Sequence, residues 1–265
     1  MKKVILVVFL FILSSLTACT SKIDTSIKPG NEGFVLGDGD IGVLLAHGLS
    51  SSPHEVKELS EYLAAKNITV YSIRLAGHGT SIEDLATKKW EDWYFDYKNV
   101  YLSLKSMKKK VFVGGMSLGG VLALKLAEDE NTDGIFALSP ALILDDKRSN
   151  YAWVFKYFSK YSLRTIPKDL ILYNYDKFSI ASVAELVELS SIVIKDLSLI
   201  DEPILIMQYR NDTRVNPESS QLVNDKVSSD KKELVLLNGT GHVFLLDDGK
   251  EGYFEQIYQF IKANT

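Results

Sequence analysis

The chain has 265 residues, of which 46% are hydrophobic and 24% are charged. This composition is that of a globular protein and excludes a disordered, fibrous or polytopic membrane protein, and the length suffices for one α/β domain with a large core. The net charge is -4 and the basic residues are scattered apart from a short run at 108–110. The basic stripe that nucleic-acid binding needs is therefore missing.

The N-terminus has the layout of a secretory leader. Two lysines precede an apolar run over 4–13, and small and polar residues lead from there to Cys19. This run is too short for a transmembrane helix, which needs about 20 apolar residues. The segment 16–19, Leu-Thr-Ala-Cys, resembles the bacterial lipobox, in which the leader is cleaved before a cysteine that receives lipid. We therefore expect a lipoprotein signal peptide over 1–18 and a membrane-anchored lipoprotein of the cell envelope, acylated on Cys19.

Two alternatives to lipidation remain at this stage. Cys19 is the only cysteine, so no disulfide can form within the chain, and it could be a free thiol in a discarded plain signal. An uncleaved anchor is the other alternative. If Cys19 is acylated, each buried CH₂ contributes about 0.8 kcal/mol, so several chains would hold a domain at the bilayer.

The segment 19–33 lacks hydrophobic periodicity and is expected to be a tether. The folded domain is expected over 34–265. Short apolar runs alternate there with helix-length amphipathic stretches, which is typical of a mostly parallel sheet with helices on both faces. The expected strands lie at 42–47, 69–73, 111–115, 134–139, 203–209 and 233–237. The expected helices lie at 53–66, 90–107, 118–129, 216–228 and 251–263.

One stretch, about 141–202, breaks this alternation. It lies between Pro140 and Pro203 and is too long for a connecting loop. Its apolar residues predict two or three short helices inserted over the sheet as a lid. They are Trp153, Phe155, Tyr157, Phe158, Tyr161, Leu186, Val187, Leu189, Ile192 and Val193.

The segment Gly-Met-Ser-Leu-Gly, centred on Ser117, matches the nucleophile elbow of a serine hydrolase. It joins an expected strand to an expected helix, which is the context that the motif requires. Glycines are needed two residues before and after the serine because side chains there would collide with the strand and the helix. The motif predicts Ser117 as the nucleophile, and the alternative is a chance match in a glycine-rich loop.

A serine hydroxyl needs a base within hydrogen-bond reach and an acid that orients the base. Of the four histidines, His47, His54 and His78 precede the serine. The order in this fold is serine, acid, histidine, which leaves His242 as the expected base. It follows the expected strand at 233–237 through a glycine-containing loop, and the alternative is an ordinary loop histidine.

The acid is expected just past the strand at 203–209, where the chain supplies Asp212. Asp201 precedes that strand and Asp247 follows His242, so neither lies at the carboxyl end of a strand facing the site. A turn or capping role is the alternative for Asp212.

The oxyanion formed on attack needs backbone N–H donors, each worth roughly 2.7–4 kcal/mol in such sites. One donor is expected from Leu118, directly after the nucleophile. The other is expected from Leu49, in the loop after the first strong strand. The neighbouring His47 is expected to brace this loop by hydrogen bonding, and the alternative for Leu49 is an exposed loop residue.

Several motifs together resemble the bacterial carboxylesterase and monoacylglycerol lipase group of α/β-hydrolases. The resemblance runs through most of 40–264 and is weakest in the lid. It implies an α/β-hydrolase fold with a small helical cap, no metal and no organic cofactor. The motifs are His47-Gly48-Leu49, the segment Arg-Leu-Ala-Gly-His-Gly at 74–79, Asp92-Trp93, the elbow, Asn211-Asp212 and Gly241-His242-Val243.

The same resemblance assigns the triad and oxyanion roles to Ser117, Asp212, His242, Leu49 and Leu118. Two features differ from the group: its oxyanion loop often has Phe at the position of Leu49, and its typical members are cytosolic. A surface-tethered enzyme would meet lipids, polymers or exogenous esters.

We therefore expect a small-molecule ester substrate, hydrolysed through an acyl-enzyme, with short to medium acyl esters or monoacylglycerols as the first hypothesis. Other reactions of this fold remain alternatives, namely thioester, aryl or feruloyl ester and C–C bond cleavage. A lipoprotein that keeps the fold as a non-catalytic binding module is a further alternative. A metal site is disfavoured because no two histidines share a helix face at ligand spacing.

Overall fold

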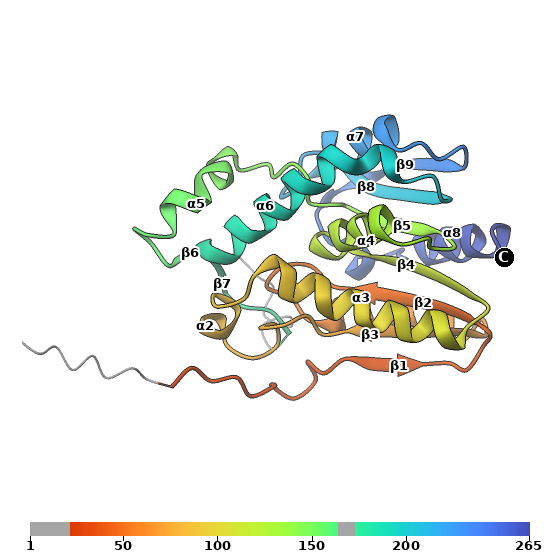
Figure 1. Ribbon diagram of the computed structural model, residues 1–265, viewed down its shortest axis with the longest axis horizontal. Coiled ribbons are helices and arrows are strands. Elements are labelled where there is room, and N and C mark those ends of the chain that lie inside the picture. Colours follow the sequence, from red (N-terminus) through yellow and green to blue (C-terminus); the bar gives the residue numbers. More distant parts are fainter. Residues whose placement is uncertain (1–21, 164–172) are drawn as a thin grey trace, which may run out of the picture.

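The computed structural model describes residues 22–163 and 173–265, so the predicted leader and Cys19 lie outside the described residues. The main sheet has the strand order β1-β3-β2-β4-β5-β8-β9, with helices on both faces (Figure 1). All neighbouring strands are parallel except β1 and β3. The strands are β1 (Phe34–Leu36), β2 (Ile41–Ala46), β3 (Ile68–Ile73), β4 (Lys110–Met116), β5 (Ile135–Leu138), β8 (Ile204–Asp212) and β9 (Lys232–Gly241).

Each face of the sheet has its own apolar core. Helices α3, α4, α6 and α7 cover one face, and α1 and α8 cover the other. These helices are α1 (Lys57–Ala64), α3 (Trp90–Met107), α4 (Leu118–Asp129), α6 (Ile180–Asp196), α7 (Glu218–Lys226) and α8 (Glu251–Ala263). A short helix, α2 (Ile82–Leu85), precedes α3.

Strand β2 shows why the central strands are apolar throughout. Leu44 and Ala46 pack in the core under α3 and α4, whereas Val43 and Leu45 pack in the core under α1 and α8. Successive side chains of a strand point to opposite faces, and both faces are covered here. A continuous apolar run is therefore the expected pattern, and alternation is not.

The predicted fold class is confirmed. All six predicted strands form and all five predicted helices are present, with α4 beginning and ending where expected. Strand β1 was not predicted. It has only three residues, lies at the sheet edge antiparallel to β3 and exposes its central residue, so it lacks the apolar run of the inner strands.

The insertion differs in part from the prediction of two or three short helices. Its first half forms a 3-10 turn over Lys147–Tyr151, the four-residue α5 (Ala152–Phe155) and the hairpin of β6 (Tyr161–Leu163) with β7 (Lys177–Ser179). Its second half is one helix of 17 residues, α6, because Leu186, Leu189 and Val193 follow a helical repeat and pack into the main core. In Figure 1, α5 and β6 lie beyond the end of α6, away from the sheet.

Within residues 22–163 and 173–265, none of the helices combines the length and apolar character that a membrane span requires.

Candidate active site

Ser117 lies between the end of β4 and the start of α4, at a sharp turn of the backbone. Its φ of 57° and ψ of -109° are unusual for a non-glycine residue. A Cβ built on Gly119 would lie 2.1 Å from the carbonyl oxygen of Ala46, and one built on Gly115 would lie 2.3 Å from the same atom. Strand β2, the elbow and α4 therefore pack too closely for any side chain at either glycine, as the motif predicted.

Hydrogen bonds fix the strained elbow in place. The N–H of Ser117 donates to the carbonyl of Leu138 in β5 at 2.8 Å, and its carbonyl accepts from the N–H of Val121 in α4 at 3.2 Å. Strain of this kind persists only where the surrounding structure determines it, and it is common at functional sites. The side chain is 9% exposed and lines a cavity at the carboxyl edge of the sheet.

His242 and Asp212 meet at the same edge. Nδ1 of His242 lies 2.8 Å from Oδ2 and 3.1 Å from Oδ1 of Asp212. Since a carboxylate only accepts, Nδ1 carries the proton and Nε2 is left to act as a base. The rival Asp247 accepts from the hydroxyl of Tyr209, and Asp201 is exposed before β8.

Asp212 is ionised in this environment. Burial alone would raise the pKa of this carboxyl, but the contact with His242 and the N–H groups of Val215 and Arg214 hold the pKa below its usual value. The two N–H groups donate to Oδ1 at 3.0 and 2.9 Å, respectively. The buried charge is thus stabilised by hydrogen bonds as well as by the imidazole.

Gln208 is a further member of this network that sequence reasoning missed. Its amide nitrogen donates to Oδ2 of Asp212 at 3.2 Å and to the carbonyl of Val215 at 2.9 Å. Its amide oxygen accepts from the hydroxyl of Ser220 at 2.6 Å. A glutamine inside an otherwise apolar buried strand was the available signal, because buried amides need partners.

The two predicted oxyanion donors come from the start of α4 and from the loop after β2. Leu118 is buried and is the first residue of α4, so its N–H is among those that a helix leaves unpaired at its N-terminus. Leu49 lies in the loop after β2 and lines the same cavity as Ser117 and His242.

His47 braces this loop, as predicted. The pKa of this fully buried imidazole is lowered to about 4, chiefly by burial, so it is neutral. Its Nε2 accepts from the N–H of Leu75 at 3.3 Å, so Nδ1 carries the proton and donates to the carbonyl of Gly48 at 2.9 Å. The ring of His78 packs edge-on against it, with centroids 4.8 Å apart.

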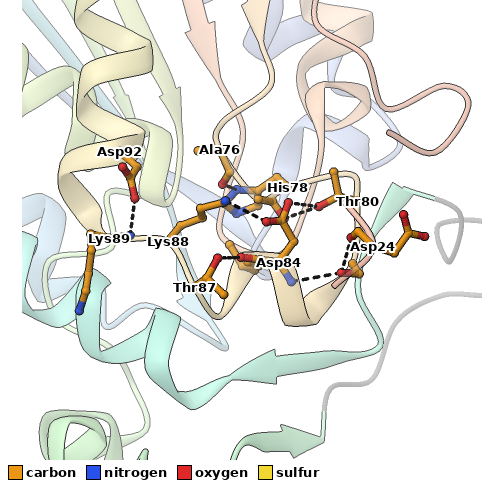
Figure 2. Close-up of polar contacts among 12 residues, drawn as sticks. Asp24, Ala76, His78, Thr80, Asp84, Thr87, Lys88, Lys89 and Asp92 are labelled. Atoms are coloured by element: carbon orange, nitrogen blue, oxygen red, sulfur yellow. Dashed lines mark hydrogen bonds and ion pairs between the residues drawn. The ribbon is translucent and has the colours of Figure 1, made fainter. Parts of the chain in front are cut away.

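The segment around His78 has a supporting role. Figure 2 shows Thr80 and Lys88 converging on the carboxylate of Asp84, at 2.8 Å in both cases. Tyr175, from the insertion, donates to the carbonyl of Gly77 at 2.8 Å. The contacts of His78 with His47 and of Tyr175 with Gly77 therefore link the oxyanion loop to the insertion through the 74–79 motif.

The cavity has a volume of about 590 Å³ and connects the sheet edge with the insertion. Its walls are largely apolar, and Ser117 and His242 are among the polar residues that line it. The apolar lining residues are Leu49, Leu144, Ala152, Phe155, Phe158, Leu163, Phe178, Ile180, Val183, Leu186, Val215 and Val243. Among the residues that the structure describes, no group of three or more His, Cys, Asp or Glu side chains could hold a metal ion.

Comparison with known proteins agrees with this arrangement. The family model described as "Serine aminopeptidase, S33" matches residues 40–176. The chain is 31% identical to a thermostable monoacylglycerol lipase from Bacillus sp. (strain H-257) over 243 residues, which cover 90% of this chain and 97% of that protein. The chain belongs to this family of serine hydrolases.

Two further relatives extend the family comparison. A carboxylesterase from Bacillus subtilis (strain 168) is 28% identical over 236 residues, which cover 86% of this chain and 95% of that protein. A solved structure from work on the metagenome-derived lipolytic enzymes LipS and LipT superposes with a TM-score of 0.84 at 27% identity, and covers 90% of this chain and 100% of that one. Each of these three comparisons covers 86–90% of this chain.

Proposed function

We propose that this protein is a serine carboxylesterase that cleaves short to medium acyl esters or monoacylglycerols through an acyl-enzyme on Ser117. The proposal rests on one arrangement of side chains. Ser117 and His242 line the same cavity, and Asp212 accepts a hydrogen bond from Nδ1 of the His242 imidazole. The named activities of the two sequence relatives, carboxylesterase and monoacylglycerol lipase, support it.

In the proposed reaction, Oγ of Ser117 attacks the ester carbonyl while Nε2 of His242 takes the hydroxyl proton. The N–H groups of Leu49 and Leu118 stabilise the resulting oxyanion. Collapse of the tetrahedral intermediate expels the alcohol, which receives the proton from His242. A water molecule then attacks the acyl-enzyme along the same route and releases the acid.

The cavity supports an apolar acyl group. Its volume of about 590 Å³ lies within the range of roughly 300–1,000 Å³ that is usual for small-molecule sites. Helices α5 and α6 and strand β6 contribute apolar side chains to its walls, namely Ala152, Phe155, Leu163, Ile180, Val183 and Leu186, beside the polar Ser162 of β6. In the proposed complex an acyl chain binds along these apolar side chains.

We also propose that the protein works at a membrane of the cell envelope, anchored by acylated Cys19. The leader pattern supports this, and so does the segment 147–163, which has four basic residues and no acidic ones. Several of its aromatic side chains are exposed, among them Trp153, Tyr157 and Phe158. Aromatic and basic side chains together suit the interface of an anionic bilayer. Incorporation of radiolabelled palmitate that persists in Cys19→Ser would contradict the anchor.

The substrate proposal is tested with a purified protein of residues 20–265 and p-nitrophenyl esters from acetate to palmitate. We expect turnover that peaks at short to medium chains and disappears in Ser117→Ala. Thioester, feruloyl ester and aminoacyl-arylamide substrates complete the panel. The aminoacyl-arylamide is included because the matching family model is described as a serine aminopeptidase. Turnover of any of these three in preference to every p-nitrophenyl ester would replace the proposed substrate class.

A non-catalytic binding module is the competing proposal from another class. It predicts that acyl ligands bind without turnover. Wild-type protein that binds a monoacylglycerol but hydrolyses no ester in the panel would favour this alternative.

A further inference from the structure

The carboxylate of Glu55 contacts the backbone of the oxyanion loop. Its Oε1 accepts from the N–H of Gly48 at 2.7 Å. The side chain belongs to a 3-10 turn over Pro53–Val56, is 6% exposed and lines the cavity of Ser117. A Cβ built on Gly48 would lie 3.1 Å from this oxygen and 3.2 Å from Cβ of Ser117. The carboxylate, the glycine and the nucleophile are therefore packed against one another.

The other side of Gly48 is also held. Its carbonyl accepts from Nδ1 of His47 at 2.9 Å and from the N–H of Ser51 at 3.2 Å. The described residues include no cis peptide bond, and a trans peptide directs its N–H opposite to its C=O. The N–H of Leu49, in the same peptide as the Gly48 carbonyl, thus points away from His47.

Two side chains therefore fix the two peptides that meet at Gly48. Glu55 holds the peptide before it, and His47 holds the peptide after it. A glycine has an unusually wide choice of backbone conformations, so neither peptide would keep its orientation by local sterics alone. The aim of the Leu49 N–H depends on both contacts.

We propose that Glu55 is a positioning residue of the oxyanion loop, which keeps the N–H of Leu49 aimed at the substrate by holding the N–H of Gly48. The inference rests on the proposed function, because it needs Leu49 as an oxyanion donor. Glu55 acts through the loop and has no part in proton transfer.

The charge of this carboxylate requires a partner, since a second negative charge beside a developing oxyanion would oppose its formation. Arg214 lines the same cavity, and its guanidinium lies over the ring of Phe178 at 5.4 Å. Burial is the main influence on Arg214 and lowers its pKa, while Asp212 and Glu55 act in the opposite direction. Because a guanidinium stays protonated in proteins, Arg214 brings a positive charge to the cavity that Glu55 also lines.

Two variants with side chains of similar size distinguish the hydrogen bond from Gly48 to Glu55 from the charge and the volume of the Glu55 side chain. Glu55→Gln keeps an acceptor for the Gly48 N–H, and Glu55→Met fills the same space without one. We expect Glu55→Gln to retain kcat within about threefold for a short ester, because its amide oxygen still accepts. We expect Glu55→Met to lower kcat by roughly 10- to 100-fold at nearly constant KM, since loss of a whole donor costs about 10²–10³.

A trifluoromethyl ketone, which forms a tetrahedral oxyanion on the serine, provides a readout that a merely structural role would not move. Its inhibition constant should rise in Glu55→Met in parallel with the loss of kcat and stay near the wild-type value in Glu55→Gln. Equal losses in both variants, or a rise in KM at unchanged kcat, would overturn the proposal.

Thermal unfolding shows whether each variant is folded before its kinetics are read. If Glu55→Met does not fold, Glu55→Asp takes its place, because its shorter side chain withdraws the carboxylate from Gly48. An unchanged kcat in Glu55→Asp would then overturn the proposal. Failure of the proposed function itself has a different signature, namely ester turnover by wild-type protein that survives in Ser117→Ala.

Discussion

The carboxyl edge of the sheet and the first half of the insertion line one cavity, but they are built in opposite ways. At the edge, Ser117 and Asp212 are 9% and 7% exposed and are held by hydrogen bonds from several elements. In the insertion, Tyr157 and Phe158 are 78% and 83% exposed on short pieces of structure. Catalysis requires fixed distances between the reacting groups, whereas entry of an apolar substrate requires apolar side chains at the cavity entrance that can change position.

This contrast predicts that substitutions at the carboxyl edge abolish ester hydrolysis, whereas substitutions in the insertion change which acyl lengths are preferred.

Asp212→Asn should have the largest effect on catalysis. An amide at this position favours the wrong tautomer of His242, and the corresponding change in serine proteases lowers kcat by about 10⁴-fold. We expect a loss on the order of 10³–10⁴ in kcat for a short ester. Asp201→Asn is the matched control, since Asp201 is exposed and lies before β8, and it should stay close to wild type. Comparable losses in both variants would remove Asp212 from the triad.

Gly119→Ala should have the largest effect on folding. The new Cβ would lie 2.1 Å from the carbonyl oxygen and 2.6 Å from the carbonyl carbon of Ala46, and these backbone atoms cannot move aside as the end of a flexible side chain can. Gly252→Ala in α8 is the control, because a Cβ there meets nothing within 4 Å. We expect the free energy of unfolding to fall by about 4 kcal/mol or more in the first variant and to rise by up to about 1 kcal/mol in the second. Urea unfolding measures both, and similar stabilities would contradict the packing of the elbow.

Gln208→Met tests the support of the acid. The variant keeps the volume but leaves Oδ2 of Asp212 and the hydroxyl of Ser220 without their amide partner. We expect a loss of about 1–3 kcal/mol in the free energy of unfolding. We also expect a fall in kcat that is smaller than that of Asp212→Asn. A kcat equal to wild type would show that Gln208 supports the fold alone.

The pH dependence of stability tests the ionised state of Asp212. Its pKa is lower in the folded protein than in the unfolded chain, where it is about 3.9. The stabilisation that the ionised Asp212 gives to the folded protein is therefore fully present above about pH 4, and it is lost as the pH falls through the folded-state pKa of Asp212. The difference in unfolding free energy between wild type and Asp212→Asn should shrink below pH 4. A difference that stays constant from pH 7 to pH 3 would contradict an ionised, stabilised carboxylate.

Phe158→Asn should have the smallest effect on the reaction itself. Phe158 lines the cavity from the insertion and is largely exposed. We expect kcat for an acetate ester to change by less than about twofold, while the preference among acyl lengths shifts several-fold toward short chains. Phe95→Asn is the control, because Phe95 is 67% exposed on α3 and is not among the residues lining the cavity. A large loss of kcat for the acetate ester would contradict this difference in role between the carboxyl edge and the insertion.

The sequence predicted the edge better than it predicted the insertion, for a physical reason. The positions of Ser117 and His242 follow from sterics and chain order, which short motifs preserve. The second half of the insertion forms a single helix, α6, because it packs on α3 and α4. Hydrophobic periodicity within 180–196 indicates such a tertiary contact only weakly. Glu55 and Gln208 were missed because their partners are backbone groups and side chains brought near by folding.

The most direct test of the central claim is the site of covalent labelling by a fluorophosphonate. The reagent forms a phosphonyl ester with an activated serine and releases fluoride, so mass spectrometry of the digested protein identifies the labelled residue. We predict one label on wild-type protein, located on Ser117, and none on Ser117→Ala. Labelling of another residue, or equal labelling of Ser117→Ala, would contradict the assignment of Ser117 as the nucleophile.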